Sequence, residues 1–190
     1  MSPVPAFETG LWNAWWFMCV YLLQWLAVVL AKPGLSEKTG HPVDIETSQS
    51  MRRRGMAANI LWIAATLYSI FLPFSPGTAW FYAGLVFFII GLAILIAGTI
   101  GFAKSPQDIP VTGYIFHYTR HPMYLSMFFI YLGVSIAAVS WLFFLITLVT
   151  FSLMRLTAIA EERYCLRKYG DAYRDYMDRT PRWLGIPKTG

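Results

Sequence analysis

The sequence has little charge and few cysteines. Charged residues make up 13% of its 190 residues, whereas a soluble domain usually has about 25%. Cys19 lies in an apolar run and Cys165 in a polar tail, and neither has the spacing of metal ligands. This composition argues against a soluble domain, and we expect neither a disulfide nor a metal site.

Hydrophobic residues, 57% of the chain, form long runs rather than periodic stripes. Each run approaches the ~20 residues that cross a hydrocarbon core of about 30 Å. We therefore expect an all-α fold, a polytopic transmembrane helical bundle of about five spans that forms one integral membrane domain over residues 1–190. The expected spans are roughly residues 11–31, 57–73, 79–98, 123–139 and 141–156.

The distribution of basic residues predicts the orientation of this bundle. All 15 Lys and Arg residues lie after the first or third run or at or beyond the end of the fifth, and none lies before the first run, in 74–78 or near Ser140. Because basic loops are retained in the cytoplasm, we expect the N-terminus outside and the C-terminus inside. The net charge of +5 then reflects orientation and anionic lipid headgroups rather than nucleic-acid binding.

Two polar segments complete the expected organisation. Residues 32–55 are polar and lack an amphipathic period, which predicts a cytoplasmic loop whose basic stretch 51–55 contacts headgroups. Residues 160–183 place tyrosines at helical spacing, which predicts an amphipathic cytoplasmic helix that continues from the fifth span and bends at Gly170.

The stretch TRHPMYLS places Arg120, His121 and Pro122 where the fourth span begins. His117 and His121 are four residues apart, as metal-binding histidines on a helix are. The residue before a proline disfavours helix, however, and no third ligand is nearby, so we expect no metal. A structural alternative is that Arg120 and His121 reach lipid headgroups while Pro122 starts the helix.

A ligand site is a further alternative for the same residues. Glu161 and Glu162 follow the fifth span, and the very short connection between the last two spans makes their cytoplasmic ends neighbours. Arg120 and His121 would then face the two glutamates at one membrane depth, where ionisable residues are functional candidates.

Three more residues extend this candidate site. Gly113 would free the backbone, and Tyr114 and Tyr124 would offer rings and hydroxyls. A zwitterion with a second positive centre suits such a set, and S-adenosylmethionine is one. Its carboxylate would meet Arg or His, its amino group or ribose hydroxyls would meet Glu, and its sulfonium and adenine would meet aromatic rings.

The order of these motifs resembles the isoprenylcysteine carboxyl methyltransferase and phospholipid methyltransferase superfamily. The resemblance covers roughly residues 111–183 and rests on Gly113-Tyr114, Arg120-His121-Pro122-Met123-Tyr124, Glu161-Glu162 and the run 169–176, YGDAYRDY. It implies that S-adenosylmethionine is held between the Arg-His-Pro segment and the glutamate pair. The predicted cofactor-binding residues are Gly113, Tyr114, Arg120, His121, Pro122, Tyr124, Glu161 and Glu162.

The resemblance also implies roles in the reaction. We expect Glu161, Glu162 and His121 to be catalytic, because an amine acceptor must lose a proton before methylation, whereas a carboxylate or thiolate needs no strong base. Arg179 and Arg182, which follow the tyrosines of the tail, are candidates for contact with an acidic group of the substrate.

The predicted function is an integral membrane methyltransferase that uses S-adenosylmethionine and a lipophilic acceptor of the isoprenylcysteine carboxylate or phospholipid amine type. Membrane sterol and steroid reductases carry a similar Arg-His-Pro-x-Tyr segment and use NADPH, so a reductase is an alternative. A non-enzymatic membrane scaffold or small-molecule carrier is another. We expect membrane lipids and a lipophilic or lipid-anchored substrate as partners, and the sequence leaves the acceptor and the oligomeric state open.

Overall fold

The computed structural model describes residues 7–31, 49–106 and 109–187, and this part of the chain is all-α, with one isolated bridge between Asn13 and Pro73 in place of strands. The expected fold class is therefore confirmed. In chain order the elements are α1 (Trp15–Ala31), α3 (Gln49–Tyr68), the 3-10 turn η1 (Ser69–Phe71), α4 (Ala79–Lys104), the 3-10 turn η2 (Tyr114–His117), α5 (Pro122–Ala137), α6 (Trp141–Tyr169) and α7 (Asp171–Arg179).

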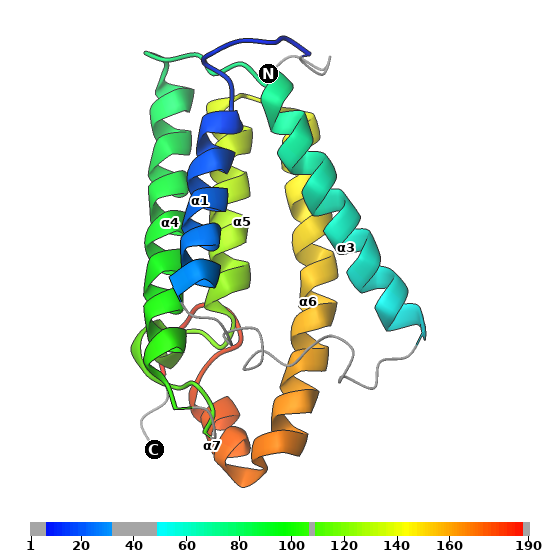
Figure 1. Ribbon diagram of the computed structural model, residues 1–190, viewed down its shortest axis with the longest axis vertical. Helices are drawn as coiled ribbons and strands as arrows, with labels where there is room; N and C mark the ends of the chain where they lie inside the picture. Colours follow the sequence, from blue (N-terminus) through cyan, green and yellow to red (C-terminus); the bar gives the residue numbers. More distant parts are fainter. Residues whose placement is uncertain (1–6, 32–48, 107–108, 188–190) are drawn as a thin grey trace.

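The long helices lie side by side in an elongated bundle (Figure 1). Helices α1, α4 and α5 pack together, and α6 packs on α5 and α3. Helix α7 turns back beneath the bundle at the end of α6, on the same side as η2 (Figure 1). The start of α5 and the end of α6 thus lie at one end of the molecule.

Two helices of the described chain, α4 and α6, are long and apolar enough to cross a bilayer. Shorter apolar stretches lie in α1, α3 and α5, at Trp15–Gln24, Gly55–Phe71 and Pro122–Ala137. Along α4, isoleucines such as Ile89 and Ile96 are exposed, as lipid-facing side chains of a membrane helix are. The structure thus contains helices suited to a membrane, while the count of five spans stays a prediction.

Several helix boundaries differ from the expected ones. Helix α3 begins at Gln49, so the expectation that 51–55 belongs to a loop is wrong, and residues 32–48 of that expected loop lie outside the described residues. The fifth run and the first part of the tail form one continuous helix of 29 residues, α6.

The C-terminal tail bends where it was expected to bend but stops being helical earlier. Gly170, between α6 and α7, has φ +57°, a conformation open to glycine, so the predicted bend is confirmed. The tail helix ends at Arg179 rather than at residue 183. Thr180 is extended because it precedes Pro181, which disfavours helical backbone at the residue before it.

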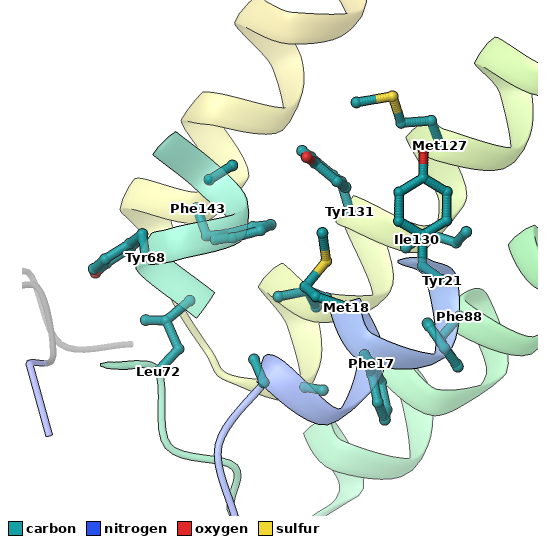
Figure 2. Close-up of a cluster of buried hydrophobic side chains, with 14 of the residues drawn as sticks. Phe17, Met18, Tyr21, Tyr68, Leu72, Phe88, Met127, Ile130, Tyr131 and Phe143 are labelled. Carbon is teal, nitrogen blue, oxygen red and sulfur yellow. The ribbon is translucent and has the colours of Figure 1, made fainter. Parts of the chain in front are cut away.

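The core gathers side chains from α1, α3, α4, α5 and α6 (Figure 2). Tyr131, Ile130 and Phe143 are fully or almost fully buried. The rings of Tyr131 and Phe143 lie 5.4 Å apart between α5 and α6, a distance typical of favourable ring packing. This core lies away from the end of the bundle that carries α7, which leaves that end for polar groups.

Helices α4 and α5 approach so closely that their backbones touch. A Cβ atom at Gly84 would lie 2.4 Å from the backbone nitrogen of Ala137, and one at Gly133 would lie 2.7 Å from the carbonyl oxygen of Gly84. Small residues permit this approach between apolar helices. The contact fixes the position of α5, whose first turn carries the polar cluster described below.

We predict that Gly84→Ala lowers the melting temperature of the purified protein by about 5 °C, because the added methyl overpacks the α4–α5 contact. Gly98→Ala on the same helix is the matched control, since its Cβ would lie 3.5 Å from Met123 and Pro122, an ordinary contact. We expect this variant to melt at or slightly above the wild-type temperature. Equal melting of the two variants would contradict the close packing.

Candidate functional site

The site forms where α5 begins and α6 ends. His121 is the residue before the first turn of α5, and Pro122 occupies that first turn, where its missing N–H costs nothing. At the far end of α5 the chain reverses through Val139, which has φ +51°, and Ser140 caps α6 by accepting a hydrogen bond from Phe143 N. Helix α6 then returns to the level of His121.

Glu162 lies at the centre of the site and is buried, with 4% of its side chain exposed. Its Oε1 atom lies 3.1 Å from His121 Nε2 and 3.3 Å from Arg120 Nη1, and accepts a hydrogen bond of 3.0 Å from Arg182 Nε. Its Oε2 atom accepts a 2.6 Å bond from Arg182 Nη2. Two arginines and a histidine thus surround one buried carboxylate.

These neighbours keep Glu162 ionised. Burial alone would raise the pKa of the carboxyl, but the hydrogen bonds from His121 and Arg182 and the charge of Arg120 lower it to about 2. Such a bidentate arginine pair is a strong, geometrically fixed contact. Because Glu162 lies beyond the ~20 residues of α6 that fill a hydrocarbon core, its partners can come from the segments that follow the helix.

Glu161 is adjacent in sequence but less enclosed. It accepts a hydrogen bond from the hydroxyl of Tyr124, its Oε2 atom lies 3.6 Å from His121 Nδ1, and 34% of its side chain is exposed. His121 therefore lies between the two glutamates. Burial by itself would lower the pKa of His121, but the contacts with Glu161 and Glu162 outweigh it and raise that pKa.

Arg120 has hydrogen-bonding capacity left over. Only 9% of its side chain is exposed, and among the described residues neither its Nε nor its Nη1 has a hydrogen-bond partner. The 3.3 Å between Nη1 and Glu162 Oε1 is an ion-pair distance without hydrogen-bond geometry. Buried donors usually have partners, so this guanidinium is suited to an anionic group.

The C-terminal segment 180–183 closes the site. The backbone N–H of Arg120 donates to the carbonyl of Pro181 at 3.1 Å. Thr119, which is fully buried, donates to the carbonyl of Arg182 at 3.2 Å and accepts from His121 N. The ring of Trp183 lies 5.8 Å from that of His121.

Three of these contributions were not foreseen from the sequence. They are the backbone-fixing hydroxyl of Thr119, the ring of Trp183 and the pairing of Arg182 with Glu162. A threonine hydroxyl can bond to the backbone two residues further on, as Thr119 does with His121 N, which is a usable signal for Thr119. The contacts of Arg182 and Trp183 depend on how α7 folds back, so no local pattern indicates them.

The structure brings Arg120, His121, Tyr124, Glu161 and Glu162 together, with Pro122 buried at the base of the site. Arg182 joins them through Glu162, while Arg179 is exposed on α7 and donates to the carbonyl of Asp175.

Tyr114 and Gly113 do not join the cluster. Tyr114 is exposed, and Lys104 Nζ lies 5.6 Å from the centre of its ring. The expectation that Gly113 frees the backbone is wrong at that residue, because its φ is −88°, whereas Tyr114 has φ +57°. The turn η2 packs tightly on α4, where a Cβ at Gly101 would lie 3.2 Å from Tyr114 Cβ. Such a packed turn can hold an unfavourable φ.

The tyrosines of the tail helix serve mainly to pack it. Tyr173 and Tyr176 are buried, and the hydroxyl of Tyr176 donates to the carbonyl of Phe116 in η2 at 2.7 Å. This bond fastens α7 to η2, the segment that leads into Arg120.

The assembled site can hold a ligand that carries both charges. Arg120 offers buried donors for an anion, and Glu161 offers a partly exposed carboxylate for a cation. His121, in contact with both glutamates, can exchange a proton with a bound group.

Comparison with known protein families identifies the region that carries this site. The model of a family described as phospholipid methyltransferase matches residues 78–172, half of the chain. This range includes α4, α5, α6 and the residues from Arg120 to Glu162, and it confirms the resemblance found in the motifs. Arg182 and Trp183 lie beyond it. No curated protein matches the sequence.

We predict that stability at acid pH depends on Glu162. Its folded-state pKa of about 2 lies below the ordinary 4.5, so its contribution is present above pH 4.5 and is lost as the pH falls toward 2. The melting temperature of the wild type should therefore fall more steeply than that of Glu162→Gln between about pH 5 and pH 3. Parallel melting curves would contradict the ion-pair assignment.

Proposed function

The chain belongs to the phospholipid methyltransferase family, and from this premise we propose that it transfers a methyl group from S-adenosylmethionine to a lipophilic acceptor at the inner end of its membrane helices. Membership of the family makes it a membrane methyltransferase in general. The methyl donor, the acceptor class and the site residues are the proposal.

The observation that carries the proposal is the buried guanidinium of Arg120, whose Nε and Nη1 lack hydrogen-bond partners among the described residues, in the same cluster as the partly exposed Glu161. When bound, S-adenosylmethionine supplies a methyl group on a positively charged sulfur. Its amino-acid end is a zwitterion, whose carboxylate suits the free Nε and Nη1 donors of Arg120. Its ammonium group or ribose hydroxyls suit the glutamate pair.

Aromatic rings near the cluster suit the rest of the donor. The ring of Tyr124 stacks against that of His121 at 5.6 Å, and Trp183 lies between His121 and Phe151, 4.8 Å from the latter ring. Ring faces attract cationic groups such as a sulfonium. Catalysis in such a site is mainly alignment and exclusion of water, since methyl transfer is an in-line displacement.

His121 and the two glutamates suit a proton-accepting role. Burial lowers the pKa of His121, but its contacts with Glu161 and Glu162 outweigh this effect and raise the pKa, which makes the neutral imidazole a stronger base. An amine acceptor of the phospholipid type must lose a proton, and neutral His121 can accept it. An acceptor of the isoprenylcysteine carboxylate type requires only alignment.

The membrane setting suits a lipophilic or lipid-anchored acceptor. We propose that the chain has about five spans, with its N-terminus outside and its C-terminus in the cytoplasm, because all 15 basic residues then lie on the inner side. The cluster lies at this inner end, so the donor reaches it from the cytoplasm and the acceptor from the bilayer.

We predict that the detergent-purified protein binds S-adenosylmethionine in calorimetric titrations and does not bind NADPH. Arg120→Gln should weaken S-adenosylmethionine binding at least about tenfold, because a charge-assisted hydrogen bond is lost. Decarboxylated S-adenosylmethionine, which lacks the anionic group, should bind the wild type and Arg120→Gln about equally.

The NADPH titration separates this function from that of a membrane reductase. Saturable binding of NADPH without binding of S-adenosylmethionine would refute the methyltransferase proposal. If Arg120→Gln weakens the binding of S-adenosylmethionine and of its decarboxylated form equally, Arg120 does not bind the carboxylate. S-adenosylmethionine would still be the methyl donor in that case.

Thiol labelling tests the proposed topology. Cys19 and Cys165 are first replaced by serine, and a single cysteine is then introduced either by Ser75→Cys, in the exposed turn before α4, or by Asp178→Cys, at an exposed position of α7. A membrane-impermeant maleimide should label the first in intact cells and the second only after lysis. The reverse pattern would invert the orientation.

A further inference from the structure

We infer that Arg155, on the lipid-facing side of α6, binds the phosphate of an anionic phospholipid in the leaflet at the α7 end of the bundle. This inference uses the proposed placement of the helices in a membrane. It goes beyond methyl transfer, because neither the methyl donor nor the acceptor takes part in it.

Arg155 is the first charged residue of α6, and it is exposed. Trp141 and Leu148 lie 14 and seven residues before it, on the same side of the helix, and their side chains are 55% and 42% exposed. Large apolar side chains that are exposed along a membrane helix contact lipid. Arg155 therefore extends from the lipid-facing side of α6.

The apolar part of α6 before Arg155 is short. Arg155 comes 14 residues after Trp141, a rise of about 21 Å, and α5 has only 16 residues, whereas a hydrocarbon core is about 30 Å thick. Helix α4, by contrast, reaches its first charged residue, Lys104, 25 residues after Ala79. A bilayer thins beside a short apolar stretch, or flanking side chains extend to the headgroups. Either response brings phosphate groups within reach of Arg155.

Among the described residues, Arg155 has no counter-ion. The ion pairs in this part of the chain use the carboxylates of Glu161, Glu162 and Asp171, and their cations are other side chains. A charge at membrane depth normally pairs with an opposite charge. A phosphate of the surrounding lipid suits Arg155, because a planar guanidinium can bind two phosphate oxygens through parallel hydrogen bonds.

The C-terminal segment lies beside this part of α6. The ring of Trp183 lies 4.8 Å from that of Phe151, which is one helical turn before Arg155. Leu184 and Ile186, next along the segment, are 66% and 92% exposed. A tryptophan followed by exposed apolar side chains suits the boundary between hydrocarbon and headgroups. The segment therefore indicates that headgroups lie at about the level of Arg155.

The charge around Arg155 favours a lipid with a net negative charge. Arg163 and Arg167 follow it at exposed positions of α6, whereas the carboxylate of Glu162 is already paired with Arg182. Each basic residue near a membrane surface adds to the attraction of anionic headgroups. Phosphatidylglycerol has the required chemistry, and because it has no amine it is not a methyl acceptor of the amine type.

The test is a lipid titration of the detergent-purified protein, followed by native mass spectrometry. We expect the wild type to bind phosphatidylglycerol at least about tenfold more tightly than a diacylglycerol with the same chains, because only the former offers charge-assisted hydrogen bonds. In Arg155→Gln the affinity for phosphatidylglycerol should fall to that for the diacylglycerol. The affinity for the diacylglycerol itself should not change.

Arg163→Gln is the matched control. It removes the same charge from an exposed position of the same helix, eight residues or about 12 Å beyond Arg155, and should change the affinity for phosphatidylglycerol less than about twofold. Arg155→Lys should keep part of the affinity, because lysine retains the charge but not the paired hydrogen bonds. Since Arg155 and Arg163 are both exposed, the melting temperature without added lipid should be that of the wild type in all three variants.

Three results would overturn the inference. If the wild type binds phosphatidylglycerol and the diacylglycerol equally, the phosphate is not recognised. If Arg155→Gln and Arg163→Gln weaken phosphatidylglycerol binding equally, the overall charge of this end attracts the lipid rather than Arg155. If phosphatidylethanolamine binds and phosphatidylglycerol does not, the site recognises an amine headgroup. The titrations contain no S-adenosylmethionine, so none of these results bears on methyl transfer, and a failure of S-adenosylmethionine to bind would not affect the role of Arg155.

Discussion

A carboxylate buried in a protein keeps its charge only if cations and donors surround it, and in this chain that constraint falls on Glu162 at the end of the helical bundle. Arg120 and His121 come from the start of α5, and Arg182 comes from the segment after α7. Three separate stretches of the chain must therefore meet at one point. The bend at Gly170, the break before Pro181 and the anchoring of Tyr176 to the Phe116 carbonyl all serve that meeting.

The apolar bundle supplies the rigid frame for this polar cluster. Helices α4 and α5 touch through Gly84 and Gly133, and α5 and α6 are joined by a turn with only Ala138, Val139 and Ser140 between them. The position of α5 along the axis of α6 is thereby fixed, and this places His121 beside Glu162. A site built on helix ends of this kind keeps its geometry better than one built on free loops.

Membership of the phospholipid methyltransferase family and the geometry of the cluster support the same chemistry from independent directions. The family match stops at residue 172, before Arg182 and Trp183. The C-terminal segment beyond that range brings Arg182 to Glu162 and places the ring of Trp183 beside that of His121.

The sequence by itself determined the helical, membrane-suited class of the chain, because long apolar runs have few alternatives. It also identified Arg120, His121, Glu161 and Glu162 as neighbours, since a very short connection between two antiparallel helices leaves their far ends together. Only the tertiary structure decided that Arg182 pairs with Glu162 and that Tyr114 lies outside the cluster. Both depend on how a non-helical segment packs against distant helices, and no local period encodes such contacts.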